Sequence, residues 1–132
     1  MKSLIPDQVN AALNAIVTKC FEGNRISDRG MSVLNVKFAL NKTEEILHEK
    51  LAHLFPLLAD EVSSYQGSRN SLTDYGATFE DVSDYQSPLE FFEKIYNFCI
   101  DLEALISEAS DLSRDVDTTT YAFLLGFLED VS

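Results

Sequence analysis

Residues 40–65 read LNKTEEILHEKLAHLFPLLADEVSSY, and this stretch decides the fold. Apolar side chains keep a seven-residue rhythm along it, at Leu40, Leu47, Leu51, Leu54, Leu58 and Tyr65. This rhythm is typical of a helix whose apolar face packs on other helices, and it predicts one long helix over about residues 29–66. Pro56 has no backbone N–H and its ring meets the carbonyl of Ala52, so we expect a kink there or a break into two helices.

A shorter helix is predicted before it, over about residues 6–22. Its apolar face repeats at spacings of three and four, and Pro6 suits a first helical turn. Gly23 and Asn24 are expected to end this helix, because both residues are common just past a helix C-terminus. Ser27 and Asp28 would then cap the long helix.

Two more helices are predicted near the C-terminus, over about residues 88–111 and 117–130. The first opens with Ser87-Pro88-Leu89-Glu90, which combines a serine cap, a proline in the first turn and a glutamate that can reach back toward the cap. Asp117 is expected to cap the second helix.

The connection between the second and third predicted helices, residues 67–86, has no apolar periodicity. Its length exceeds what a tight turn between antiparallel neighbours needs, so we expect it to cross the length of a bundle. The sequence therefore predicts an all-α fold: an up-down four-helix bundle with a long crossover between helices 2 and 3, formed as one domain over residues 1–132.

Charge limits the classes of partner. The chain carries 10 basic and 22 acidic side chains, a net charge of −12, which repels phosphate backbones and anionic lipid surfaces. Neither nucleic acid nor membrane is expected as a partner. No signal-peptide or membrane-spanning segment is evident, so a cytoplasmic location is expected. Cys20 and Cys99 lie among apolar residues and are interpreted as reduced core positions.

Three segments resemble the ferritin-like superfamily, in the right order. Residues 43–49, TEEILHE, resemble the second-helix motif of ferritins, in which a Glu and a His three residues on bind one metal. Residues 87–93 resemble the opening of the third ferritin helix, and residues 117–124 with 127–130 resemble the fourth. The resemblance implies a ferritin-like four-helix bundle and an iron site.

The expected metal ligands are Glu44, Glu45 and His48. On an α-helix Glu44 and Glu45 both share a face with His48, and mixed oxygen and nitrogen ligation suits Fe(II), Mn(II) or Zn(II). The alternative interpretation is a solvated face with ordinary ion pairs. His53 follows His48 by five residues, about 140° around a straight helix, so the two imidazoles are not expected to bind one ion.

The rest of the ferritin pattern is incomplete. Between Asp7 and Glu22 the chain has no carboxylate, Cys99 falls where the third helix would supply a ligand, and the fourth helix has no Glu-x-x-His. An incomplete di-iron site is therefore expected, and no catalytic residue is assigned.

Two functions remain open from the sequence. One is a metal-binding protein, with iron as the first expectation, Mn or Zn as alternatives, and oxidation of Fe(II) as its chemistry if it is an enzyme. The other is a metal-free bundle that acts as a scaffold or interaction protein. In either case a homodimer or a higher homo-oligomer is expected.

Overall fold

The computed structural model describes residues 2–74, 76, 81 and 83–131, and every regular element in these residues is a helix. The elements are α1 (Asp7–Val36), α2 (Asn41–Leu47), the π-helical turn η1 (His48–Ala52), α3 (Leu54–Ser68), α4 (Pro88–Ser113) and α5 (Thr118–Val131). The prediction of an all-α fold is confirmed for the described residues.

The first helix is much longer than predicted. α1 runs without interruption for 30 residues, so the predicted end at Gly23 and the predicted new start near Arg29 are both wrong. Gly23 and Ser27 are buried inside this helix. They do not act as a stop signal and a cap, because they face the core of the molecule.

Aromatic rings explain why α1 carries glycine at buried positions. A Cβ atom at Gly23 would lie 2.6 Å from Cε1 of Phe98 and 2.9 Å from the ring of Phe55, and one at Gly30 would overlap the ring of Phe91. Glycine within a helix costs about 1 kcal/mol relative to alanine. Close packing of three buried rings against the helix offsets that cost.

A tight turn at residues 37–40 separates α1 from the second helical arm, which consists of α2, η1 and α3. Ala39 adopts a positive φ of 54°, and the N–H of Leu40 donates to the carbonyl of Leu34 at 3.0 Å. A residue in the left-handed region just past the last turn is a common way to end a helix, and the Leu40 bond satisfies one carbonyl of that turn. The single long helix predicted over residues 29–66 is therefore divided between α1 and this arm.

The C-terminal helices begin close to where the sequence predicts. The Ser87 side chain accepts from the N–H of Glu90 at 3.3 Å, and the Glu90 carboxylate accepts from the N–H of Gln86 at 2.7 Å. Asp117 accepts from the N–H and the hydroxyl of Thr120 at the start of α5. Both predicted caps, Ser87 and Asp117, are confirmed.

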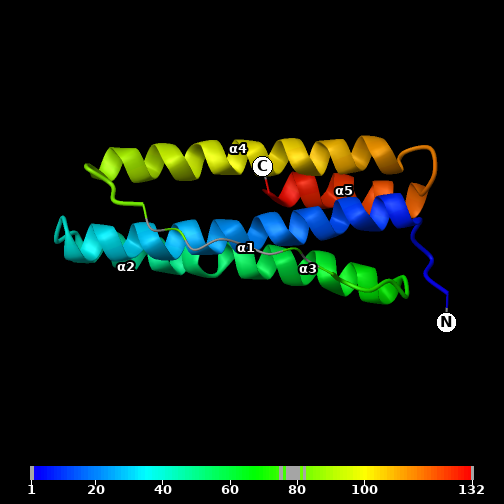
Figure 1. Cartoon of the computed structure of the whole chain (residues 1–132), viewed down its shortest axis with the longest axis horizontal. Helices are drawn as coiled ribbons and strands as arrows, with labels where there is room; N and C mark the ends of the chain where they lie inside the picture. Colours follow the sequence, from blue (N-terminus) through cyan, green and yellow to red (C-terminus); the bar gives the residue numbers. More distant parts are fainter. Residues whose placement is uncertain (1, 75, 77–80, 82, 132) are drawn as a thin grey trace.

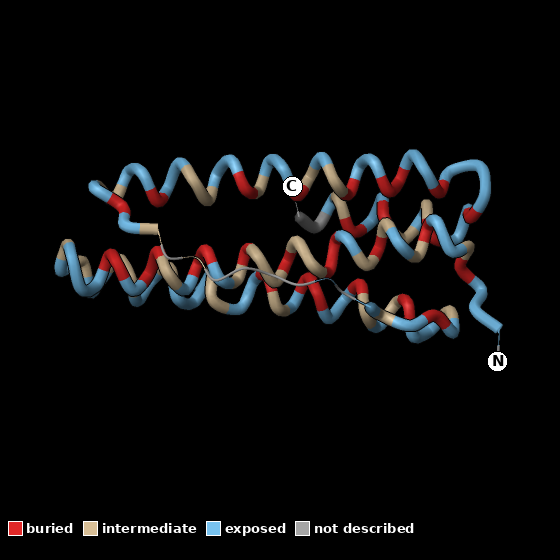
Figure 2. The backbone as a smooth tube through the Cα atoms, viewed as in Figure 1, coloured by how far each residue is buried: buried red, intermediate tan, exposed pale blue. Residues whose placement is uncertain are grey.

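The helices run lengthwise in antiparallel pairs (Figure 1). α1 packs against α2, α3 and α4, and α4 packs against α5. On the remaining side, the hydroxyl of Tyr65 in α3 lies 2.9 Å from that of Thr120 in α5, and its ring stacks on Phe123 at 4.0 Å. Buried residues face the space between the helices (Figure 2).

The connection from α3 to α4 lies along α1. Its described residues are hydrogen-bonded to side chains of α1 and of Lys37, the residue that follows α1, in ascending order on both segments: Leu72 with Asn10, Asp74 with Asn14, Gly76 with Thr18, Ser83 with Arg29, and Tyr85 with Lys37. The described residues of the connection therefore contact α1 from its first turns to its C-terminal end. α4 consequently runs in the same direction as α3 (Figure 1).

A buried amide fixes the start of the connection. Gln66 of α3 is fully buried, and its amide nitrogen donates at 2.8 Å to the side-chain oxygens of both Asn10 and Asn14. Its amide oxygen accepts from the hydroxyl of Thr73 at 2.9 Å. Because each polar atom of Gln66 has a partner, its burial costs little, and the network joins α1, α3 and the connection.

Candidate metal site on the second helical arm

Glu44, Glu45 and His48 lie on the part of the second arm that contributes least to the core. Glu44 is partly buried, whereas Glu45 and His48 are exposed. No residue of α2 or η1 is buried, and the arm becomes buried only from α3 onward (Figure 2). The three side chains therefore occupy an accessible surface at one end of the molecule.

Pro56 accounts for the break in the arm. A proline at this position cannot donate to the carbonyl of Ala52, and its ring would collide with that carbonyl in a regular α-helix. The chain adopts a π-helical turn over His48–Ala52, passes through His53 with φ −101° and ψ −16°, and starts α3 at Leu54. Of the two alternatives, kink or break, the structure has the break, and it lies just before Pro56.

The π-turn brings together the side chains of His48 and His53, which were expected to lie on different faces of a straight helix. The imidazole rings of His48 and His53 make an edge-to-face contact with centroids 5.5 Å apart and an interplanar angle of 81°. The expectation of a 140° separation assumed a straight α-helix. In a π-helical turn the backbone hydrogen bonds join residues i and i+5 and the turn is wider, so residues five apart lie closer to one face than in an α-helix. Pro56 was the one signal in the sequence for this pairing.

The structure does not bring Glu44, Glu45 and His48 together as a set of metal ligands within the described residues. In the part of the chain that the structure describes, no group of three or more His, Cys, Asp or Glu side chains is assembled for a metal ion. Within the same residues, no ion pair within 4.0 Å joins His48 or His53 to a carboxylate. The arrangement is thus an accessible set of nitrogen and oxygen donors on one helical arm.

The cysteines are poor candidates for ligands or redox groups. Both are free thiols. Burial raises the pKa of Cys20 to about 12, and burial, followed by the nearby Glu103 charge, raises the pKa of Cys99. A raised pKa disfavours the thiolate, which is the form that binds metals and reacts with oxidants.

A second polar cluster, which the sequence did not reveal, fixes the end of the connection. The Asp81 side chain is only 3% exposed; it accepts from the N–H and hydroxyl of Ser83 and from the hydroxyl of Tyr85, and Lys94 of α4 lies 3.6 Å away. Burial alone would raise the pKa of Asp81, but these hydrogen bonds and the Lys94 charge outweigh it and hold the pKa below its usual value.

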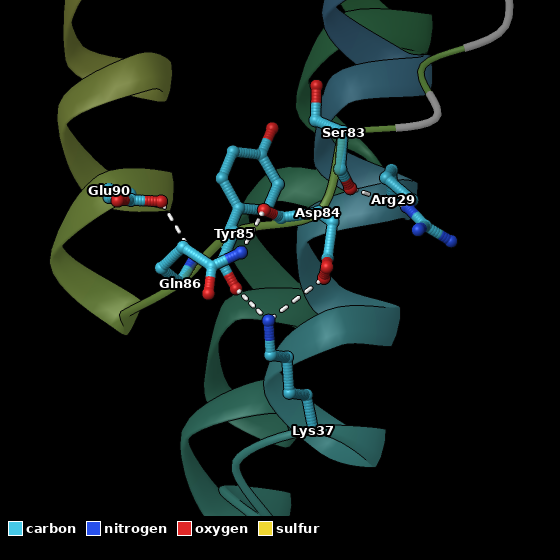
Figure 3. Close-up of polar contacts among 7 residues, drawn as sticks. All are labelled: Arg29, Lys37, Ser83, Asp84, Tyr85, Gln86 and Glu90. Carbon is cyan, nitrogen blue, oxygen red and sulfur yellow. Dashed lines mark hydrogen bonds and ion pairs between the residues drawn. The ribbon is translucent and has the colours of Figure 1, made fainter.

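Neighbouring residues extend this cluster to α1 (Figure 3). Arg29 donates to the carbonyl of Ser83 at 2.8 Å, and Lys37 donates to the Asp84 carboxylate and to the carbonyl of Tyr85 at 3.0 and 2.9 Å. Tyr85 is buried, and burial together with the Asp81 charge raises its pKa to about 12. Because its charged and polar groups are satisfied by one another, the cluster serves to position the connection.

Comparison of the chain with protein family models, with curated proteins and with solved structures finds no match. Among the described residues, no helix has the length and apolar character that crossing a membrane requires.

Proposed function

We propose that this chain is a ferritin-like four-helix bundle that binds a divalent transition-metal ion on its second helical arm. Three features of the architecture support the proposal: the helices have antiparallel neighbours, the described residues of the connection contact α1 along its length, and Tyr65 and Phe123 join α3 to α5 on the fourth side. This arrangement fits the ferritin-type bundle with one long crossover. A cytoplasmic location belongs to the same proposal.

One observation carries the metal-binding function: Glu44 and Glu45 lie in the helix that leads into a π-turn, and His48 is the first residue of that turn. π-turns are rare and often found at functional sites. The donor set of two carboxylates and an imidazole fits Fe(II), Mn(II) and Zn(II), with iron the ion that the resemblance implies. Water, or a second copy in a homo-oligomer, would supply the remaining ligands.

Ion binding is better supported than Fe(II) oxidation. A di-iron centre of the ferritin type takes ligands from all four helices of the bundle. Here the accessible donors come from one arm, and the partly buried Cys99 occupies the place where the ferritin resemblance would put a ligand from the third helix. Glu44 and Glu45 would hold the ion and His48 would fix its position.

Metal titration of the purified chain tests the proposal. We expect Fe(II), Mn(II) and Zn(II), each titrated under anaerobic conditions in a calorimeter, to bind with a stoichiometry near one per chain for at least one ion. His48→Ala and Glu45→Gln should each weaken binding by about tenfold or more, because even groups that only orient a ligand are worth that much. Glu61→Gln, an exposed acid on α3, is the matched control and should bind as the wild type. Equal binding by all four proteins, or no binding at all, would refute the proposed site.

A specific observation favours the second candidate, a metal-free interaction protein. Exposed apolar side chains line the N-terminal half of α4, at Leu89, Phe92, Tyr96 and Ile100. α5 ends about halfway along α4, so it does not cover this half (Figure 1). A second copy of the chain would bury the stripe in a homodimer.

Sedimentation analysis separates the two candidates. If the stripe forms a dimer interface, Tyr96→Glu should convert a dimer into a monomer, whereas the same change at the exposed polar residue Asn97 should not. A dimer that survives Tyr96→Glu, or a wild-type monomer, would rule out this interface.

A further inference from the structure

We infer that His48 and His53 form a two-imidazole anchor, and that this anchor makes Zn(II) the preferred ion among those considered for the site. The inference rests on the proposed metal-binding function and specifies its ligand set and its ion. It adds His53, which lies outside the Glu-x-x-His motif.

The separation of the two rings is close to that of two imidazoles bound to one ion. A zinc–nitrogen bond is about 2.0–2.1 Å long and the ring centroid lies roughly 1 Å behind the nitrogen, so two imidazoles on one tetrahedral ion have centroids about 5 Å apart. The observed separation is 5.5 Å. Both side chains are exposed, so they can rotate to direct one nitrogen each at the ion without disturbing the core.

The backbone holds the pair in this position. The π-turn spans His48–Ala52, and His53 follows it directly, so the two residues are separated by one π-helical repeat. Leu51 on one side of His53 and Phe55 on the other contribute to the core, which fixes the arm on both sides of the pair. The two imidazoles are therefore presented together before any ion binds, which reduces the entropic cost of chelation.

A second imidazole changes which ion is favoured. Zn(II) binds nitrogen and oxygen donors more tightly than Fe(II) or Mn(II), and imidazole is among its preferred ligands, whereas all-oxygen sites suit manganese. The two imidazoles would supply two ligands to the ion, with water in the remaining positions.

Histidine-selective NMR provides the test, because the chain contains two histidines and each gives its own imidazole resonances. Zinc sulfate added to the isotope-labelled wild-type chain should shift the resonances of both rings along one binding curve. Calorimetry should show His48→Ala and His53→Ala each lowering zinc affinity by about tenfold or more. Zinc should also displace Fe(II) and Mn(II) from the wild type.

The possible results of these experiments separate the two-imidazole anchor from the proposed metal-binding function on which it rests. If an ion binds through His48 while the His53 resonances stay in place and His53→Ala binds normally, the two-imidazole anchor is refuted and the simpler site stands. If Fe(II) or Mn(II) outcompetes zinc at a site that needs both rings, the assigned ion is wrong. If no ion shifts either ring, both the inference and the proposed function are refuted. Circular dichroism of each variant, expected to match the wild type because both positions are exposed, verifies folding.

Discussion

At the scale of single residues, glycines and charged groups have roles that depend on neighbours distant in sequence. Gly23 and Gly30 are sites for aromatic rings from α3 and α4, and Asp81 is held by Ser83, Tyr85 and Lys94. Glycine and asparagine next to one another look like a helix end in a sequence, and nothing local indicates that a phenylalanine will pack there. The local sequence at Gly23 and Asn24 therefore predicted a helix end that the structure does not have.

Gly30→Ala should destabilise the protein by about 1–3 kcal/mol, the usual cost of overpacking a core, because the new methyl group would overlap the ring of Phe91. Gly126→Ala is the matched control: it lies in α5, has no atom within 4 Å of the added Cβ, and should gain up to about 1 kcal/mol from helix propensity. Urea unfolding of both variants provides the measurement. Equal effects at the two glycines would contradict the packing of Phe91 on α1.

Asp81→Asn should lower stability at neutral pH and change its pH dependence. The pKa of Asp81 in the folded chain lies below the ordinary value of 3.8, so the folded state favours the carboxylate. This contribution to stability is present above about pH 4 and is lost as the pH falls through the folded-state pKa. The difference in unfolding free energy between wild type and Asp81→Asn should therefore shrink on acidification from pH 6 to pH 3. A difference that grows on acidification would reverse the assigned sign.

At the scale of helices, the sequence predicted the bounds of the well-capped helices α4 and α5 closely, and it did not predict the bounds of the helices in the second arm. Ser87 and Asp117 mark helix starts with their own side chains, so α4 and α5 were predicted within a few residues. The turn at residues 37–40 has Ala39 at its left-handed position, where glycine is usual, and thus gave no signal. Pro56 indicated a disruption, but a π-turn five residues long cannot be derived from one proline.

Deletion of Lys50 tests the π-turn. Lys50 is exposed within η1, and its removal should restore an α-helical repeat while the two histidines, now four residues apart, stay on one face. We expect the deletion variant to bind zinc within about tenfold of the wild type, since a helical i,i+4 histidine pair is a usual zinc-binding arrangement. Zinc binding by the deletion variant alone, with none by the wild type, would show that the wild-type arm is a regular α-helix.

At the scale of the whole molecule, the apolar periodicity of the sequence predicts an all-helical fold, and the length of residues 67–86 predicts a long connection. The full set of proposed metal ligands cannot be predicted in this way. Periodicity indicated which faces are apolar, and the aperiodic residues 67–86 indicated one long connection. The pairing of His48 with His53 depends on the local change of helical repeat. The sequence thus led to Glu44, Glu45 and His48 as proposed ligands, and the contact between the two rings adds His53 to the proposal.

The net charge of −12 predicts that added salt stabilises the folded chain. Acidic side chains held on a compact surface repel one another more than in the unfolded chain, and counterions screen this repulsion. The thermal unfolding midpoint should rise between low salt and 0.5 M NaCl, and most of the rise should come at the low-salt end. A midpoint that falls over this range would indicate that attractive ion pairs dominate instead.

X-ray absorption at the zinc edge tests the central claim, metal binding on the second helical arm, most directly. For the chain loaded with one equivalent of zinc, we predict two imidazole ligands with zinc–nitrogen distances of about 2.0–2.1 Å and oxygen ligands in the remaining positions. The His48→Ala protein treated in the same way should lose the two-imidazole signature. A spectrum of fully hydrated zinc from the wild-type chain, with no imidazole scattering, would contradict the account.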